Sequence, residues 1–243
     1  MPRSSKVPAK LMLVVQVALV VLVALGGNAR AQDPAQDRAA DASLPKVVLV
    51  GDSIRLSYAE AVQKLLAGKA TVVGPRANGG DSGNVLRNLD AWVIDERPSV
   101  VHFNCGIHDT KKFKQSGRFQ VSPEQYEANL RKIVETIRRE TGAVVLFATS
   151  TPIHDERAAA TRRERDYELL DASIEQYNAI ARRVMNELDV PVDDLNAVLR
   201  RAAKSDPSVE LIVADGVHLT AVGRQLLAET VAEFVEQRLP KAE

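Results

Sequence analysis

The chain has 243 residues, with 32 Lys and Arg against 32 Asp and Glu and a single cysteine. Balanced charge without a long basic stripe argues against a nucleic acid partner, and one cysteine excludes an internal disulfide bond. The four histidines follow no spacing typical of metal ligands, so we expect no metal centre and no cofactor.

The first 31 residues have the pattern of a secretory signal peptide. A basic start without acids precedes the apolar run 11–27, and Ala29 and Ala31 provide a small-residue cleavage site. The apolar run is at the short end of a membrane span, so an uncleaved anchor is the weaker alternative. The sequence therefore predicts cleavage after Ala31 and an exported protein, secreted or periplasmic.

The rest of the chain is predicted to form a linker and one domain. Removing residues 1–31 would leave 212 residues and, since those 31 carry four basic residues and no acid, a net charge of −4. That length suits a single domain with a full core. Residues 32–45, rich in Ala, Asp and Gln, are predicted to be a flexible linker. Residues 46–243 are predicted to be the domain.

Within this domain, short β-branched runs alternate with amphipathic segments. Strands are predicted over residues 46–51, 70–75, 99–106, 143–150 and, as a shorter one, near 190–195. Helices are predicted over residues 57–68, 84–96, 122–142, 162–189 and 220–239. Nearly continuous apolar strands are typical of parallel strands covered on both faces. The alternation predicts a doubly wound α/β sandwich with a mostly parallel sheet.

In such sheets, ligands bind beyond the carboxyl ends of the strands. The first predicted strand is followed at that end by Gly51-Asp52-Ser53. Ser53 has two interpretations. It is either the N-cap of the next helix or a nucleophilic hydroxyl beside free backbone amides. A nucleophilic serine needs a base that takes its proton, and that base must come from elsewhere in the chain.

Asp215 and His218, in the stretch 213–220, offer such a base. Their spacing lets one tight turn bring the carboxylate to one imidazole nitrogen and leave the other nitrogen free for a serine. The alternative is a turn aspartate and a histidine that caps the last helix. Because Thr220 already provides an N-cap, that alternative does not require His218.

Two further turns at the same edge of the sheet could surround a developing negative charge. The Gly-rich segment 76–84 lets backbone amides approach a ligand closely. Asn104, His108 and Asp109, at the end of the third strand, add polar side chains that could donate to an oxyanion.

Together these stretches resemble the SGNH hydrolases, also called GDSL-type esterases and lipases. The matching blocks are GDSI at 51–54, GGDS at 79–82, GIHD at 106–109 and DGVH at 215–218. Their order and spacing agree over residues 46–238. The resemblance implies a flavodoxin-like three-layer α/β/α sandwich with a five-stranded sheet and a serine esterase with a Ser-His-Asp triad.

The same resemblance assigns roles to individual residues. Ser53 would be the nucleophile, His218 the general base and Asp215 the residue that orients it. The backbone amides of Ser53 and Gly80 would form the oxyanion hole.

One position departs from the family pattern. His108 stands where the family usually has an asparagine that donates to the oxyanion. A neutral imidazole can donate one hydrogen bond, so His108 can take that role, and Asn104 is the other candidate donor.

The remaining polar residues have simpler interpretations. His102 is expected to be a hydrogen-bonded core histidine, Cys105 a small buried hydrophobe and His154 an ordinary loop residue. Residues 162–168 are expected to form the exposed face of a long helix. Solvated loop positions are expected for Lys111, Lys112 and Lys114.

The sequence thus predicts an exported esterase acting through an acyl-enzyme on small-molecule or glycan esters. Short O-acyl groups on carbohydrates, such as O-acetyl, are favoured because aromatic residues make up 4% of the chain and no long apolar lid is present. The alternatives are a lipase or lysophospholipase, an acyltransferase with the same residues, and a non-catalytic glycan-binding protein. A metal-dependent hydrolase is a further alternative, with candidate ligands Asp52, Asp109, Asp215, His108 and His218.

Overall fold

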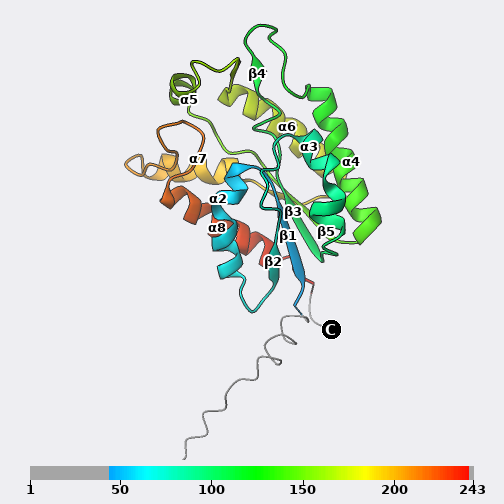
Figure 1. The fold of residues 1–243 in the computed structure, drawn as a ribbon. Coiled ribbons are helices and arrows are strands. Elements are labelled where there is room, and N and C mark those ends of the chain that lie inside the picture. The colour runs from blue at the N-terminus through cyan, green and yellow to red at the C-terminus, as the bar shows by residue number, and fades with distance from the viewer. Residues whose placement is uncertain (1–43, 241–243) are drawn as a thin grey trace, which may run out of the picture.

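A computed structural model describes residues 44–240 (Figure 1). The predicted signal peptide, residues 1–31, lies outside the described residues, as does all of the predicted linker except its last two positions.

The core of the fold is one five-stranded parallel sheet, in the order β2-β1-β3-β5-β7. Its strands are β1 (Lys46–Val50), β2 (Thr71–Val73), β3 (Val100–Phe103), β5 (Val144–Ala148) and β7 (Val192–Asp193). Counting these strands along the chain gives the order 2-1-3-4-5, which is the flavodoxin-like order. The predicted fold class and all five predicted strands are confirmed.

Helices cover both faces of the sheet (Figure 1). Strand alternation sends Val47 and Leu49 of β1 into one apolar cluster and Val48 and Val50 into the other. The first cluster packs under α2 (Ser53–Leu65), α7 (Leu195–Ser205) and α8 (Ala221–Glu236). The second packs under α3 (Ser82–Arg87), the π-helical turn η1 (Asp90–Ile94), α4 (Pro123–Thr141) and α6 (Asp171–Glu187).

The first helix begins earlier than predicted, and this decides the role of Asp52. The Asp52 carboxylate accepts a hydrogen bond from the Ile54 amide at 2.9 Å and is the N-cap of α2, so Ser53 is the first helical residue. The interpretation of Ser53 as a helix cap is therefore wrong. Thr220 caps α8 as predicted, accepting from the Gly223 amide at 3.1 Å.

The predicted helix over 162–189 is also wrong in its first part. Helix α5 (Asp155–Thr161) ends before it, and β6 (Tyr167–Glu168) pairs antiparallel with β4 (Lys112–Phe113). Residues 162–166 carry charges and no apolar side chain, so a helix there would have no face to bury. The chain is helical again from Asp171.

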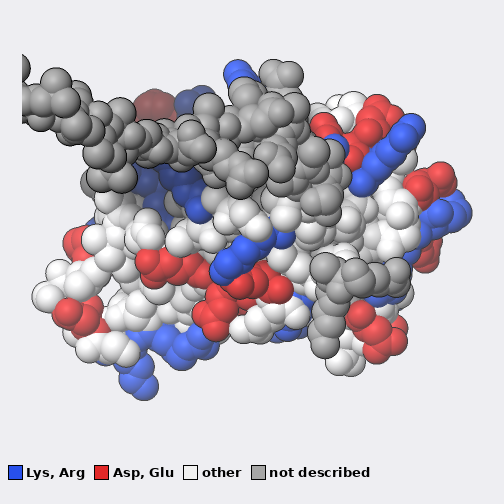
Figure 2. All heavy atoms as spheres, turned by 90° about the horizontal axis from the view of Figure 1, so that it is seen from below, with Lys and Arg blue, Asp and Glu red and all other residues white. Residues whose placement is uncertain are grey.

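The loops that follow the parallel strands lie at one end of the sheet, together with β4 and α5 (Figure 1). The opposite end carries basic and acidic side chains intermixed over the described part of the face drawn in Figure 2. Ion pairs join Lys46 to Glu96 at 3.2 Å and Lys69 to Glu236 at 2.6 Å. None of the helices within residues 44–240 is both long and apolar enough to cross a membrane.

Candidate active site

The turn after β1 is held in place by Arg55. The Arg55 guanidinium is buried and donates to the carbonyl oxygens of Gly51 at 3.3 Å, Pro75 at 2.9 Å and Ala77 at 3.2 Å. A Cβ atom added at Gly51 would lie 2.7 Å from the Arg55 Cβ, so glycine is required for this close packing. Arg55 thus joins the Ser53 turn to the Gly-rich loop, a link that the sequence analysis missed.

Ser53, His218 and Asp215 are connected by hydrogen bonds in series. The Ser53 Oγ lies 2.9 Å from the His218 Nε2, and the His218 Nδ1 lies 2.5 Å from the Asp215 Oδ2. The serine and the histidine are 165 positions apart in sequence, and the fold brings them together at the carboxyl edge of the sheet. The three residues predicted as a triad therefore meet in the predicted order.

The turn that carries Asp215 prepares its carboxylate for this contact. The Asp215 Oδ1 accepts from the amides of Val217 at 2.8 Å and His218 at 2.9 Å. Partial burial opposes ionisation, but the hydrogen bonds from the His218 ring and the two amides outweigh it and lower the pKa of Asp215. The carboxylate is therefore ionised at neutral pH. It accepts the Nδ1 proton of His218, which leaves the Nε2 lone pair toward Ser53.

Helix α5 supports the same turn from behind. The Asp215 carbonyl oxygen accepts from the Thr161 hydroxyl at 3.2 Å and from the Arg162 guanidinium at 2.8 Å. Gly216 has φ +75°, its amide donates to the Val213 carbonyl at 3.0 Å, and its oxygen accepts from the His154 amide at 2.8 Å. A Cβ atom added at Gly216 would lie 2.5 Å from the Ala158 nitrogen in α5. The expectation that Arg162 only lies on an exposed helix face is wrong, because its guanidinium binds the Asp215 carbonyl and stabilises the candidate site.

The two backbone amides predicted for the oxyanion hole are in different states. The Ser53 amide has no hydrogen-bond partner among the described residues. The Gly80 amide donates to the exposed Asn78 side-chain oxygen at 2.9 Å, in a turn where Gly80 has φ +62°. A ligand oxygen at Gly80 would therefore have to displace the Asn78 carboxamide.

The two candidate side-chain donors also differ. Asn104 is buried, and its amide nitrogen donates to the Ala148 carbonyl at 2.7 Å at the end of β5. His108 is half-buried, and its Nδ1 lies 3.1 Å from the Lys111 Nζ. An ammonium group donates and cannot accept, so this Nδ1 accepts and the proton of a neutral His108 is on Nε2.

The charge state of His108 follows from its surroundings. Burial and the Lys111 ammonium lower the pKa of His108, and His218 acts in the same direction, while the carboxylates of Asp52 and Asp81 oppose them. His108 is thus a neutral donor at Nε2. Lys111 also lies 5.1 Å from the ring centroid of Tyr167 in β6, so the expectation of a solvated Lys111 is wrong.

Asp109 joins the Gly-rich loop to the loop of His108. Its buried carboxylate accepts from the Ser82 amide at 2.9 Å and from the Ser82 hydroxyl at 2.5 Å. Burial raises the pKa of Asp109 to about 7, although the bonds from Ser82 act against this shift. The sequence analysis named Asp109 among the polar residues near the oxyanion and as a candidate metal ligand, and its contact with Ser82 gives it a structural role instead.

Two further residues that the sequence singled out, His102 and Cys105, lie as expected, whereas Lys112 lies in β4 and pairs with Glu168 at 4.0 Å instead of being a solvated loop residue. His102 is fully buried in β3 with its Nε2 3.1 Å from the Asp193 Oδ2, which confirms a hydrogen-bonded core histidine. Cys105 is buried in the second apolar cluster, and burial raises the pKa of its thiol well above the usual value. Within residues 44–240, no group of three or more His, Cys, Asp or Glu side chains is arranged to hold a metal ion.

A parallel α/β sandwich with a hydroxyl, an imidazole and a carboxylate in series at its carboxyl edge has the arrangement by which serine hydrolases cleave esters. A family model confirms the class. It matches residues 49–226, and the chain belongs to the GDSL-like Lipase/Acylhydrolase family.

Solved structures share the fold. A lipase/acylhydrolase from Enterococcus faecalis is 23% identical, with 82% of this chain and 100% of that chain covered and a TM-score of 0.65. The acetyl xylan esterase AlAXEase is 19% identical, with 78% and 99% covered and a TM-score of 0.62. An acetylxylan esterase from Geobacillus stearothermophilus is 19% identical, with 78% and 93% covered and a TM-score of 0.63. A comparison with curated proteins gave no match.

Proposed function

We propose that the protein is an exported serine esterase that removes short O-acyl groups, such as O-acetyl, from carbohydrates. The observation that carries the proposal is the series of hydrogen bonds from Ser53 through His218 to Asp215. Export rests on the signal-peptide pattern of residues 1–31.

The reaction would begin at Ser53. His218 Nε2 takes the Ser53 hydroxyl proton as the oxygen attacks the ester carbonyl, and the resulting imidazolium is stabilised by Asp215. When the carbon–oxygen bond to the alcohol breaks, His218 gives this proton to the leaving oxygen. Water then enters, His218 takes its proton, and the acyl-enzyme is hydrolysed to the free acid and the original serine.

Three hydrogen-bond donors would stabilise the intermediate oxyanion. The Ser53 amide is available, the Gly80 amide becomes available when the Asn78 side chain turns away, and His108 donates from Nε2. We favour His108 over Asn104 because His108 is half-buried, whereas Asn104 is buried and one of its two amide hydrogens is held by the Ala148 carbonyl.

The carbohydrate substrate is supported by two observations. The similar structures include two acetyl xylan esterases, each 19% identical to this chain. The His218 side chain is 45% exposed, so the candidate site is open enough for a bulky alcohol such as a glycan. The lipase/acylhydrolase among the similar structures keeps lipid esters as the second candidate substrate.

The first test is labelling with a fluorophosphonate, which reacts with activated serines. Intact mass should increase by one adduct in the wild type and by none in Ser53→Ala. A folded wild-type protein without an adduct would contradict the esterase and favour the glycan-binding alternative.

Chain length and acceptor are tested next. Activity on p-nitrophenyl acetate should exceed activity on the octanoate, and an octanoate optimum would favour the lipase. To test the acceptor, the enzyme is incubated with an acetylated saccharide and an excess of a second, unacetylated saccharide. An esterase should release free acetate. Transfer of the acetyl group to the second saccharide would indicate an acyltransferase.

A further inference from the structure

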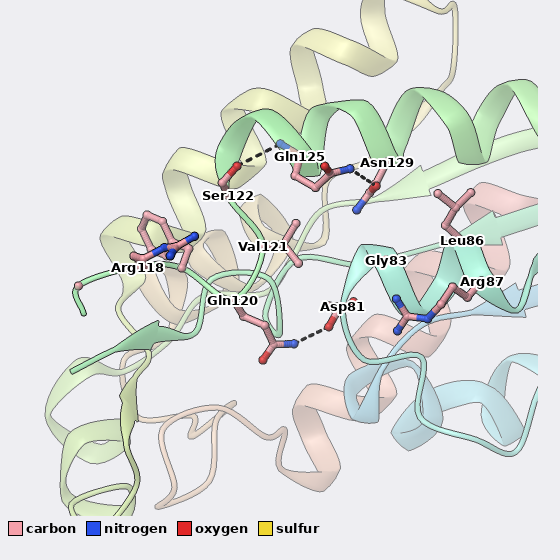
Figure 3. Close-up of a pocket in the computed structure, with 12 residues that line it drawn as sticks. Asp81, Gly83, Leu86, Arg87, Arg118, Gln120, Val121, Ser122, Gln125 and Asn129 are labelled. Carbon is pink, nitrogen blue, oxygen red and sulfur yellow. Dashed lines mark hydrogen bonds between the residues drawn. The ribbon is translucent and has the colours of Figure 1, made fainter. Parts of the chain in front are cut away.

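A pocket of about 750 Å³ lies between α3 and the segment that leads into α4 (Figure 3). One wall is α3 with its N-cap Asp81, and the other is the segment 117–125 that leads from β4 into α4, with Asn129 behind it. A volume of this size is typical of pockets that bind a small molecule or a few sugar residues.

The walls of the pocket belong to the segments that carry the proposed oxyanion donors. Asp81 directly follows Gly80. On the other side, the Val121 amide donates to the Asp109 oxygen at 3.2 Å and the Gln120 amide donates to the Lys111 oxygen at 2.8 Å. The pocket therefore borders the two loops that carry Gly80 and His108.

Two arginines line opposite ends of the pocket (Figure 3). Within the described residues, the Arg118 guanidinium has no hydrogen-bond or ion-pair partner, and that of Arg87 meets the Asn84 side-chain oxygen at 3.4 Å and no carboxylate. Asp81, the acidic residue of the lining, is already used, since it caps α3 through the Asn84 amide at 2.8 Å and accepts from Gln120. The pocket thus presents two cations against one carboxylate that is already hydrogen-bonded.

The amide side chains of the pocket are oriented by their own hydrogen bonds. Gln120 donates to Asp81, and Gln125 donates to the Asn129 oxygen at 2.8 Å, as the dashed lines in Figure 3 show. Asn129 in turn donates to the Ser82 hydroxyl at 2.8 Å. These hydrogen bonds leave the side-chain oxygens of Gln120 and Gln125 without a partner among the described residues. The two oxygens can therefore accept hydrogen bonds from sugar hydroxyls.

From this arrangement we infer that the pocket binds carboxylate-bearing sugars, that is uronate residues, next to the acylated sugar of the substrate. Arg87 and Arg118 bind carboxylate groups, since guanidinium matches carboxylate geometry, and Gln120 and Gln125 accept from hydroxyls. The partly buried Phe119 supplies an apolar surface for a sugar ring. The inference rests on the proposed esterase function and narrows its substrate to acidic glycans.

The test compares three acetyl esters. The acidic substrate is O-acetylated trigalacturonate, the neutral one is O-acetylated xylotriose, and p-nitrophenyl acetate is too small to reach the pocket. For Arg118→Gln and Arg87→Gln, kcat/KM on the acidic substrate should fall about tenfold each, the effect of one charge-assisted hydrogen bond. On the neutral saccharide and on p-nitrophenyl acetate, kcat/KM of both variants should change less than twofold.

Arg201→Gln is the matched control. Arg201 is an exposed arginine of α7, which lies on the opposite face of the sheet from α3 and α4. It does not line the pocket. This variant should act like the wild type on all three esters. Equal losses on the acidic and neutral saccharides, or no loss on either, would overturn the inference. The inference would also be overturned if the Arg87 and Arg118 variants lost kcat/KM on an acyl ester of an anionic phospholipid but not on the acidic saccharide.

A binding measurement separates failure of the pocket from failure of the esterase. Ser53→Ala should bind unacetylated trigalacturonate more tightly than xylotriose by isothermal titration, and the additional change Arg118→Gln should remove this preference. If wild-type protein fails to cleave p-nitrophenyl acetate, the proposed function is wrong, and the binding preference still supports the pocket. An active enzyme without any preference for trigalacturonate would overturn the pocket alone.

Discussion

Two histidine–aspartate pairs lie within the described residues, and their surroundings differ. In one, His218 Nδ1 meets Asp215 at 2.5 Å, and the side chains are 45% and 30% exposed. In the other, His102 Nε2 meets Asp193 at 3.1 Å, and the side chains are 0% and 2% exposed. The second nitrogen of His218 meets the Ser53 hydroxyl, whereas that of His102 is buried without a partner among the described residues.

The comparison shows that an imidazole–carboxylate contact does not by itself make a catalytic base. A base must accept a proton during the reaction, and a fully buried imidazole gains a charge at a high desolvation cost. The base must also point a free nitrogen lone pair at a hydroxyl group. His218 can do so because it lies in a turn at the edge of the sheet. His102 lies in β3, and its side chain is fully buried.

The largest expected difference between the two pairs is the effect of removing each carboxylate charge. Asp215→Asn should lower kcat on p-nitrophenyl acetate about 10⁴-fold, because an amide favours the His218 tautomer that cannot accept from Ser53. The matched change Asp193→Asn should leave kcat per folded molecule within about twofold, since that pair has no nucleophile. Comparable losses of kcat in both variants would contradict the separation of roles.

A third histidine sharpens the comparison, because its partner is a cation. His108→Ala should lower kcat about 10²- to 10³-fold with little change in KM, as expected when one oxyanion donor is lost. His108→Asn places a carboxamide donor where the family usually has one and should recover most of the activity. Loss of kcat in an Asn104 variant, without loss in His108→Ala, would assign the donor to Asn104.

The buried pair should act on stability instead. His102→Ala leaves the Asp193 carboxylate buried without this partner, so the free energy of unfolding should fall by about 3 kcal/mol. Urea denaturation measures the change, and kcat of the folded fraction should stay near the wild-type value. His102→Gln, which can still donate to Asp193, should lose less. A folded His102→Ala protein with strongly reduced kcat would mean that the buried pair also takes part in catalysis.

Much of the fold and of the candidate site follows from local sequence patterns. Apolar runs alternating with amphipathic segments were enough to predict the five strands, because burial on both faces leaves a continuous apolar signal. The spacing of Asp215 and His218 predicted their contact, since both lie in one turn. The distant Ser53 could be placed because parallel strands end at one edge of the sheet.

What could not be predicted depends on contacts between distant segments or on the detailed geometry of side chains. Arg162 was assigned to a helix because its neighbours carry suitably spaced charges, whereas it supports the Asp215 carbonyl. The pairing of β4 with β6 is likewise long-range and leaves no local signal in residues 162–168. The Asn78 side chain on the Gly80 amide and the Lys111 contact of His108 depend on side-chain geometry, which composition and spacing do not encode.

The smallest expected effect tests how a partner decides what a histidine does. Asp215 accepts at His218 Nδ1 and makes Nε2 an acceptor, while Lys111 donates at His108 Nδ1 and makes Nε2 a donor. Lys111→Met removes this constraint and should lower kcat about 2- to 10-fold, the effect of one ordinary hydrogen bond. Lys112→Met is the control, because Lys112 pairs with Glu168 at 4.0 Å instead.

Nitrogen NMR separates this role from a general loss of structure. In the wild type, His108 should carry its proton on Nε2, and in Lys111→Met the Nδ1 tautomer should become populated. The pKa of His108 should rise in the variant, because the Lys111 ammonium holds it down. His108 therefore becomes charged at a higher pH than in the wild type. A wild-type His108 protonated on Nδ1 would contradict the assignment, since Nδ1 could then no longer accept from Lys111.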